Sequence, residues 1–338
     1  MRLSYRARQR LKRFAIGFAI VAVFALLAGM IWFVAQNPYV VYTREGAKID
    51  KSLPRELSGG KPAEPAKQKP VSIYYNEGEN AINTSTELTQ ITGYYADTEA
   101  LREDVYTVLS QVKELPASTP VMVDVKNAKG AFFYSSSVST TRDSAIDTAG
   151  MDQLIAYLQS SQMYAIARLP ALRDYEYGLN HVPDGLPTSG GYLWADDDYC
   201  YWLNPSSQGT ITYLIQIVTE LKALGFDEVV FDEFYFPDTE KIVFNGDKED
   251  AIATAAKTLL TACGTDTFAV SFVGQTPTFP LPEGRSRLYI ENAAAAQVDT
   301  VAAQTGLADP TVNLVFLTEI HDTRFNTYSV LRPLDAAH

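Results

Sequence analysis

The chain has 338 residues, 20% of them charged, and a formal net charge of −12, which fits one large domain or two modest ones. Its acidic balance disfavours binding to nucleic acid and to anionic lipid headgroups. Two cysteines are too few for a disulfide framework, and the three histidines include no His-Glu-x-x-His pair typical of a zinc hydrolase. We expect neither a metal ion nor an organic cofactor.

The N-terminus has the pattern of a membrane anchor. Residues 1–13 form a basic flank with six Arg and Lys residues, and residues 14–34 form an uncharged apolar run. About 20 apolar residues suffice to span a bilayer, and a basic flank belongs on the cytoplasmic side. We therefore predict a single-pass protein of the cell membrane with its C-terminal domain outside the cytoplasm. A cleaved signal peptide is the alternative, although the run is longer than a usual signal core and lacks a clear small-x-small cleavage site.

A linker and one large domain follow the anchor. Residues 35–70 are rich in Lys, Glu, Pro, Gly and Ser, a composition that buries little apolar surface and predicts a flexible linker. Residues 71–338 are enough to build a core of their own. Without the basic flank, 22 basic residues face 40 acidic ones, a net charge of −18. Such a surface suits a neutral or cationic ligand, but solubility alone explains it equally well.

Strand and helix patterns alternate after the linker. Eight strands are predicted, at residues 91–96, 121–125, 164–168, the apolar part of 225–237, 268–273, 288–291, 312–318 and, weakly, 328–331. Two helices between the first strands are marked by apolar stripes, namely Leu101, Val105, Val108, Leu109 and Val112, then Met151, Leu154, Ile155 and Leu158. For a third helix we expect Asn204 as N-cap, Pro205 as first residue and Gly225 as terminator.

This alternation predicts an α/β fold. Eight strand–helix units over this length favour a closed (β/α)8 TIM-like barrel over an open doubly wound sheet. No Gly-x-Gly-x-x-Gly or phosphate-loop pattern follows any strand, which argues against a nucleotide-binding fold. In such a barrel the loops after the carboxyl ends of the strands form the reactive face.

Four motifs carry a family resemblance. They are Val123-Asp-Val-Lys126, Ile166-Ala-Arg168, Trp202-Leu-Asn-Pro205 and the stretch from Gly225 to Pro237. In order and spacing, the chain resembles the putative glycoside hydrolase domain found in many bacterial secreted proteins. The resemblance implies a (β/α)8 barrel related to glycosidases. Asn127 stands where the family has Asp, and Glu233 and Tyr235 stand where it has Tyr and Arg.

Acids at predicted strand ends are the candidate catalytic residues. Asp124, Asp232, Glu233 and Glu291, together with Glu319, should converge on one face of the barrel although they are far apart in sequence. Glycoside hydrolysis needs two carboxylates that flank the scissile bond, one protonated as general acid and one ionised. Arg168, at the end of the third strand, could hold one of them ionised through a bidentate pair. Loop caps or surface ion pairs are the structural alternative for each acid.

Aromatic residues are the candidate substrate contacts. Trp194 and Trp202 lie in a long connection after the third strand, Tyr235 follows the fourth strand, and Tyr94 lies on the first. Flat rings with polar neighbours suit the C–H faces of sugars. With Arg168, these four residues form the predicted substrate-binding set. The alternative is that some of the rings only pack the long loop onto the barrel.

The acidic run in the long connection and the two cysteines are expected to have structural rather than catalytic roles. The run 196–198 of three Asp residues could bind Ca²⁺, but it lacks the spacing and the Gly of a calcium loop, so a solvated acidic turn is favoured. Cys200 should lie on the carboxyl face of the barrel and Cys263 at the end of a helix that returns to the opposite face. We therefore predict two free or buried thiols and no bridge.

Two functions remain open. The first is a membrane-tethered glycosidase acting on a cell-wall or extracellular glycan polymer through a pair of barrel-face carboxylates. The second is a catalytically inactive barrel that binds glycan or supports a cell-envelope assembly through its aromatic loop.

The anchor can be tested by fractionation. If residues 14–34 span the membrane uncleaved, intact protein should fractionate with membranes and retain Met1 or Arg2, because nothing removes the apolar run. N-terminal sequencing and mass spectrometry of the membrane fraction check this. A mature N-terminus near Asn37 would identify a cleaved signal peptide instead.

Overall fold

The computed structural model describes residues 40–43, 46–49 and 87–334. The chain divides into two compact units, residues 1–80 and 81–338, which are described separately. In the first unit, β1 (Val40–Thr43) and β2 (Gly46–Ile49), which lie within the predicted linker, form a two-stranded antiparallel sheet. The predicted flank and anchor, residues 1–34, lie outside the described residues. Within the described part, no helix has the length and apolarity that a membrane crossing needs.

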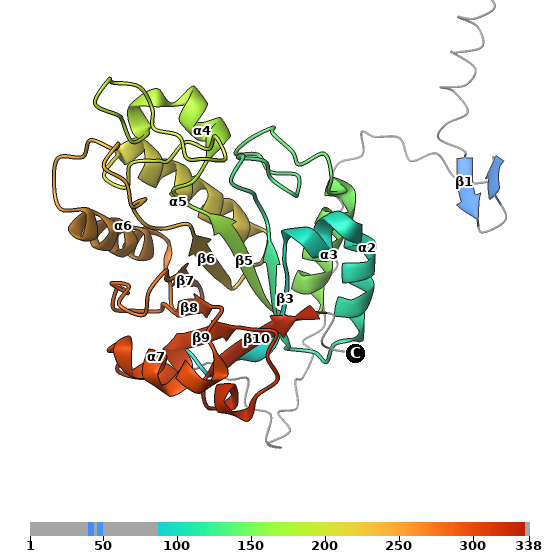
Figure 1. Ribbon diagram of the computed structural model, residues 1–338. Coiled ribbons are helices and arrows are strands. Elements are labelled where there is room, and N and C mark those ends of the chain that lie inside the picture. The colour runs from blue at the N-terminus through green and yellow to red at the C-terminus, as the bar shows by residue number, and fades with distance from the viewer. Residues whose placement is uncertain (1–39, 44–45, 50–86, 335–338) are drawn as a thin grey trace, which may run out of the picture. The chain divides into compact units, whose positions relative to one another are not determined.

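The second unit is a closed barrel of eight parallel strands (Figure 1). The strands are β3 (Thr92–Ala96), β4 (Pro120–Asp124), β5 (Tyr164–Pro170), β6 (Glu228–Asp232), β7 (Ala269–Val273), β8 (Leu288–Glu291), β9 (Leu314–Leu317) and β10 (Ser329–Pro333). The last strand pairs with the first, Val330 opposite Thr92, and this closes the barrel. All eight predicted strands are present, including the weakly marked one at 328–331, and the TIM-like α/β fold is confirmed.

Helices cover the outside of the barrel unevenly. Long helices follow the first, second, third and fourth barrel strands, namely α2 (Thr98–Glu114), α3 (Thr148–Ser160), α5 (Gln208–Ala223) and α6 (Lys248–Cys263). In Figure 1, α2 packs beside α3, and α5 beside α6. The connection from β7 to β8, residues 274–287, contains no helix. The remaining helices are short: α4 (Tyr175–Asn180), η2 (Val182–Asp184), η3 (Ala295–Gln297), α7 (Val298–Gln304), α8 (Pro310–Asn313) and η4 (Thr323–Thr327).

The predicted apolar stripes are the buried faces of the first two helices. The buried residues of α2 are the five predicted ones, and those of α3 are the four predicted ones plus Gly150. The predicted start of the third helix is wrong. Helix α5 begins at Gln208, and its N-cap is Ser207, whose hydroxyl accepts the N–H of Gly209. Asn204 instead forms a turn in which its side chain and carbonyl accept the N–H groups of Ser206 and Ser207. Gly225 follows the helix with φ +90°, a conformation that suits glycine.

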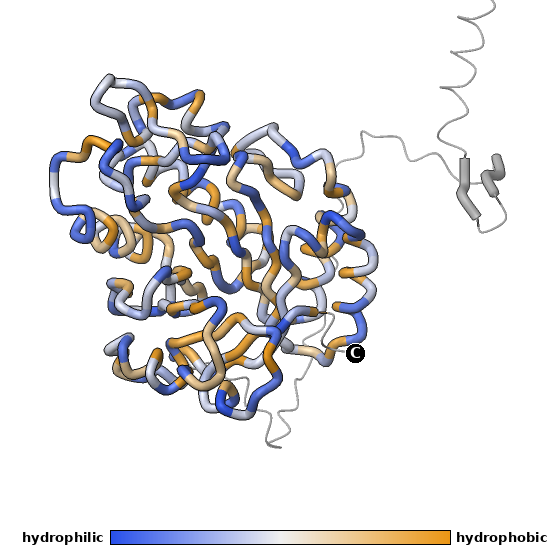
Figure 2. The backbone as a smooth tube through the Cα atoms, in the orientation of Figure 1, coloured by the Kyte–Doolittle hydropathy of each residue, from blue (hydrophilic) through white to orange (hydrophobic). Residues whose placement is uncertain are grey.

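The core has two layers. Figure 2 shows the barrel strands and the inward faces of the helices as mostly hydrophobic, with hydrophilic loops between them. Two apolar clusters lie outside the strands, the larger (here called the outer cluster) against β3 to β7 and the smaller against β8 to β10. A third fills the barrel interior: Ile91, Met122, Ile166, Val230, Val273, Tyr289, Val315, Leu317 and Leu331. Cys200 and Cys263 are buried and free, so the prediction of two unbridged thiols is confirmed.

A buried ion pair closes the amino end of the barrel. Glu228, at the start of β6, pairs with Arg287, just before β8, and the two side chains are 0% and 1% exposed. Tyr164, Ser271 and Tyr289 donate their hydroxyls to the same carboxylate. Buried charges are tolerated only when they are paired and hydrogen-bonded. This network meets that condition, so a polar cluster can fill the amino end of the barrel below the apolar interior.

Breaking this pair should destabilise the barrel. Arg287→Met leaves the Glu228 carboxylate buried without its cation, which should lower the free energy of unfolding by about 3–5 kcal/mol. Urea denaturation of the full chain measures the change. Arg324→Met is the matched control, because Arg324 pairs with Asp322 at an exposed site where solvent screening leaves little stability to lose. Equal losses in both variants would show that the buried pair is no more important than a surface one.

Candidate active site

Arg168, from β5, lies among three carboxylates at the carboxyl end of the barrel. Its Nε and Nη2 donate to Oδ2 of Asp232 on β6 at 3.1 and 2.7 Å. Its Nη1 lies 3.0 Å from Oε1 of Glu291 on β8, and its Nε lies 3.8 Å from Oδ1 of Asp124 on β4. The structure therefore brings together four of the residues predicted from the sequence, from four different strands.

The two-residue period of the strands explains this convergence. Ile166, Val230 and Tyr289 point into the barrel interior. Side chains two residues further along a strand face the same way, which places Arg168, Asp232 and Glu291 above them. All four charged residues end or nearly end their strands, so their heads reach the barrel mouth, where exposed fractions run from 13% for Asp124 to 35% for Glu291.

Asp124 differs from the other two acids because it is already engaged by a helix. Its Oδ2 accepts the backbone N–H of Thr98 at 2.8 Å and the Thr98 hydroxyl at 2.7 Å. Thr98 is the first residue of α2. The carboxylate thus satisfies one of the unpaired N–H groups at a helix start. It ties β4 to α2 and has less acceptor capacity free for a ligand than Glu291, which the structure places in an ion pair with Arg168.

Burial and the guanidinium act in opposite directions on the acids. Burial raises the pKa of Glu291, and the charges of Asp232 and Asp124 add to this, while Arg168 lowers it. Burial likewise raises the pKa of Asp124 against the opposing effects of Arg168 and Thr98. The carboxylates raise the pKa of Arg168 although burial alone would lower it. The site therefore holds a permanent cation beside an acid, Glu291, that keeps its proton to a higher pH than usual.

Asp232 and Glu291 are close enough to act on one bond. Each has an oxygen on a terminal nitrogen of the same guanidinium, at 2.7 and 3.0 Å. Because those nitrogens are joined through one carbon, the two oxygens lie at most about 8 Å apart, a bound that is compatible with the separations of glycosidase carboxyl pairs. The two acids come from β6 and β8, with β7 between them.

A second arginine organises the predicted acidic turn and Glu233. Arg173 Nε and Nη2 lie 2.6 Å from Asp196 and 2.6 Å from Asp198, and Nη1 lies 3.5 Å from Oε1 of Glu233. Asp196 is therefore held in an ion pair, while Asp197 and Asp198 are exposed in a turn, as predicted for this acidic run. Burial raises the pKa of Glu233, and the neighbouring Asp232 adds to this, while Tyr235 and Arg173 lower it.

The predicted aromatic contacts separate into different environments. Trp202 is only 3% exposed, and its ring lies 5.0 Å from that of Tyr235 and 6.3 Å from that of Trp194. Trp194 and Tyr235 are partly buried against the same outer core cluster. Trp202 therefore packs the long loop onto the barrel, which was the plainer explanation of these rings.

On the first barrel strand, the structure places a neighbouring tyrosine at the mouth. Tyr94 packs against the outer cluster, on the helix side of β3, whereas Tyr95 packs against the barrel interior. Burial, with the charges of Glu319, Asp97 and Glu291, raises the pKa of Tyr95 to about 12. Sequence reasoning missed Tyr95; the inward position of Ile91 four residues earlier on the strand was the available signal.

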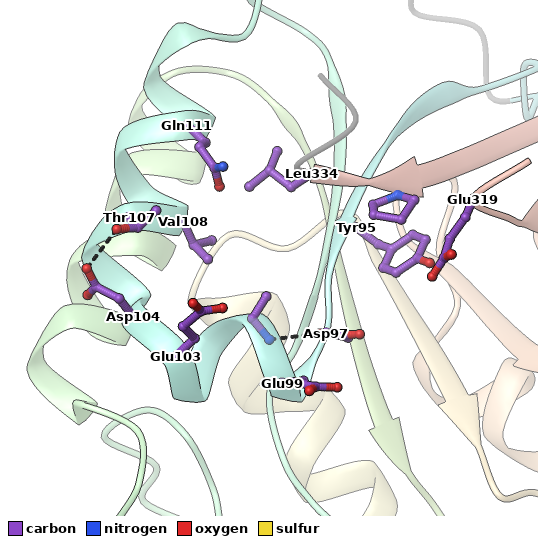
Figure 3. Close-up of a pocket in the computed structure, with 12 residues that line it drawn as sticks. Tyr95, Asp97, Glu99, Glu103, Asp104, Thr107, Val108, Gln111, Glu319 and Leu334 are labelled. Carbon is purple, nitrogen blue, oxygen red and sulfur yellow. Dashed lines mark hydrogen bonds between the residues drawn. The ribbon is translucent and has the colours of Figure 1, made fainter. Parts of the chain in front are cut away.

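A groove of about 730 Å³ lies beside the mouth, between α2 and the ends of β3 and β10 (Figure 3). Tyr95 and Glu319 lie together at one end of it, and Gln111 and Leu334 lie near the other. Glu319 is exposed and lines this groove, so it lies apart from the three acids around Arg168. Among the described residues no group of three or more His, Cys, Asp or Glu side chains is arranged to hold a metal ion.

The comparison with protein-family models decides the family. Residues 90–265, more than half of the chain, match the model described as "Putative glycosyl hydrolase domain". The chain belongs to this family. The matched range contains Asp124, Arg168, Asp232 and Glu233, while Glu291 lies beyond it. The comparison with curated proteins gave no match.

Solved structures similar to this member of the putative glycosyl hydrolase family include two alpha-galactosidases and a hypothetical protein. The galactosidase domain of AgaSK, an alpha-galactosidase-sucrose kinase, matches with a TM-score of 0.52 at 10% identity, over 74% of this chain and 38% of that one. The alpha-galactosidase from Lactobacillus brevis matches with a TM-score of 0.50 at 10% identity, over 75% and 38%. A hypothetical protein from Ruminiclostridium thermocellum ATCC 27405 matches at 21% identity, over 53% and 96%, with a TM-score of 0.44. This chain spans about two fifths of the two galactosidases, and the likeness establishes the shared barrel fold.

The raised pKa of Glu291 predicts a stability effect with a definite sign. An acid whose pKa is higher in the folded protein costs stability once it ionises, and costs nothing below its unfolded pKa of about 4.3. Glu291→Gln should therefore raise the free energy of unfolding at pH 7, and the gain should vanish as the pH falls below about 4. Urea denaturation at several pH values measures it.

Glu220→Gln is the control with the opposite sign. Burial would raise the pKa of Glu220, but hydrogen bonds from Ser136, Ser137 and Tyr134 outweigh burial and lower it. Its contribution is present above the unfolded pKa and is lost at acid pH, so this variant should be less stable than wild type at pH 7. Destabilisation by Glu291→Gln at pH 7 would mean that attraction to Arg168 outweighs the burial of Glu291.

Proposed function

We propose that the protein is a membrane-anchored extracytoplasmic glycoside hydrolase that acts on a cell-wall or extracellular glycan, with Asp232 and Glu291 as the carboxyl pair. The observation that carries the proposal is the contact of one guanidinium, that of Arg168, with both acids at the barrel mouth. Membership of the putative glycosyl hydrolase family and the shared barrel of the two galactosidases support a carbohydrate substrate.

The two acids have environments that suit different roles. Glu291 is the proposed general acid, because burial raises its pKa and so favours the protonated form that can donate to the glycosidic oxygen. Asp232 is the proposed carboxylate, because one of its oxygens, Oδ2, accepts two hydrogen bonds from the Arg168 guanidinium. Arg168 also restrains both side chains, so that a sugar entering the mouth meets acids already in position.

The reaction then needs only these two groups and water. The proton of Glu291 passes to the leaving oxygen as the glycosidic bond breaks and the sugar ring takes on positive charge. Asp232 either removes a proton from an attacking water or attacks the anomeric carbon directly. In the second route the ionised Glu291 then takes a proton from a water that cleaves the bond between the sugar and Asp232. An upper bound of about 8 Å on the oxygen–oxygen separation fits both routes, with retained or inverted configuration.

One observation favours the second candidate function, an inactive barrel that binds glycan. Arg168 occupies the position between Asp232 and Glu291 and is 18% exposed, so a sugar must displace or share this guanidinium to reach both acids. If the guanidinium does not yield, the barrel would present the groove beside Tyr95 and Glu319 as a binding surface instead.

Substitution of each acid separates these functions. Purified full chain is assayed on a panel of 4-nitrophenyl α- and β-glycosides and on purified wall polysaccharides. Asp232→Asn should reduce kcat by a factor of at least about 10⁴ on every substrate, because the ionised carboxylate is required whatever the leaving group. Glu291→Gln should lose far less on 4-nitrophenyl glycosides than on polysaccharides, because nitrophenolate leaves without a proton.

An exposed ion pair that contains neither proposed acid provides the control. Arg324→Gln removes a cation from an exposed pair in η4 and should leave all rates unchanged. Unchanged hydrolysis by Asp232→Asn would remove Asp232 from the mechanism. Binding of polysaccharide by wild type, with no turnover of any substrate, would establish the inactive barrel.

A further inference from the structure

Glu233, the residue after Asp232, has a strained backbone that the structure holds in place. Its φ is +51°, in the left-handed region that residues with a side chain seldom adopt. Two hydrogen bonds fix this conformation: its N–H donates to Oδ1 of Asp232 at 2.7 Å, and its carbonyl accepts the N–H of Leu172 at 3.3 Å. Strain of this kind gathers at functional sites when the surroundings over-determine it. The positions of Asp232 and Glu233 are thus coupled.

The Glu233 side chain belongs to a closed ring of five residues. Its carboxylate lies 3.5 Å from Arg173 and is hydrogen-bonded to Tyr235. Arg173 bonds Asp196 at 2.6 Å, and the same Asp196 oxygen accepts the indole N–H of Trp202 at 3.0 Å. The Trp202 ring packs at 5.0 Å against Tyr235, which completes the ring. The long loop after β5 therefore determines where the Glu233 carboxylate lies.

The ring leaves the Glu233 carboxylate open to a ligand. A carboxylate has about four acceptor positions, and among the described residues the contacts of this one are the long Arg173 arm and Tyr235. The side chain is 24% exposed, and its charge raises the pKa of Glu291, so it lies within electrostatic range of the proposed acid. By contrast, Oδ2 of Asp232 accepts two hydrogen bonds from Arg168.

We propose that Glu233 binds hydroxyl groups of the sugar beside Asp232, and that Arg173 and Asp196 are the positioning residues that hold it there. This inference rests on the proposed function, and assigns to Glu233 substrate binding in place of proton transfer. Hydrogen bonds to sugar hydroxyls are a known part of glycosidase binding. Trp202, which is buried, serves the same positioning through its indole N–H.

A double-mutant cycle tests the positioning. The 4-nitrophenyl glycoside that wild type hydrolyses fastest is used with Glu233→Gln, Arg173→Gln and the double variant. Each single change should raise KM on the order of tenfold, as expected for a hydrogen bond to a charged group, with kcat changed far less. The double variant should be no worse than the worse single variant, because both changes remove the same contact. Arg173→Lys, which keeps the charge, should recover part of the loss.

Other outcomes contradict the inference. If the effects of Arg173→Gln and Glu233→Gln on KM multiply, the two residues act independently and Arg173 only stabilises the loop. If Glu233→Gln lowers kcat and leaves KM unchanged, Glu233 is part of the proton transfer. Arg324→Gln should leave both constants unchanged.

A wild-type protein that binds glycan without hydrolysis refutes the proposed function alone. The same cycle is then measured on the Kd for the bound polysaccharide, with the same expected non-additivity. A wild type that neither binds nor hydrolyses any member of the panel would overturn the inference together with the function.

Discussion

The contact of Arg168 with three carboxylates determines the geometry of the whole barrel mouth. Asp124, Asp232 and Glu291 arrive from β4, β6 and β8, and without a cation among them their like charges would repel at close range. A carboxylate at a low-dielectric site is tolerated only when it is paired and hydrogen-bonded. The guanidinium pairs with all three acids at once and donates two hydrogen bonds to Asp232. Thr98 supplies the hydrogen bonds of Asp124. The arrangement of the acids thus follows from one side chain on β5.

The barrel uses a comparable solution at its other end and in its long loop. Glu228 and Arg287 close the amino end as a fully buried pair, and Arg173 fastens the acidic turn of the loop to Glu233. The two arginines near the mouth therefore divide its acids into two groups, one on the strands and one on the loop. Each group is held by a planar cation before any ligand arrives. Such preorganisation is what binding and catalysis by fixed charges require.

The sequence predicted the barrel and its central charges because they depend on local periodicity. Strand runs and apolar helix stripes predicted the barrel, and positions at predicted strand ends placed Arg168, Asp232 and Glu291 on one face. The sequence did not predict which of several nearby residues would make a given hydrogen bond. Ser207 displaced Asn204 as helix cap because a serine nearer the helix offered the same acceptor.

Backbone conformation and burial account for the other differences. Tyr94 and Tyr95 are adjacent, so the choice between them depends on which side of the strand faces inward; Ile91, four residues before Tyr95, marks that side. Trp202 was predicted to contact sugar, but its indole N–H donates to Asp196 and its ring is buried in the core. The left-handed backbone of Glu233 depends on hydrogen bonds to Asp232 and Leu172, and no sequence pattern marks it.

The most direct test of the account is a crystal structure of Glu291→Gln with a glycan bound. The account predicts that the scissile glycosidic oxygen lies within hydrogen-bond distance of residue 291. The anomeric carbon should face Asp232, and Arg168 should still hold Asp232 through two hydrogen bonds. A glycan seated instead in the groove beside Tyr95 and Glu319, with the mouth closed by Arg168, would contradict the hydrolytic pair and support a binding barrel.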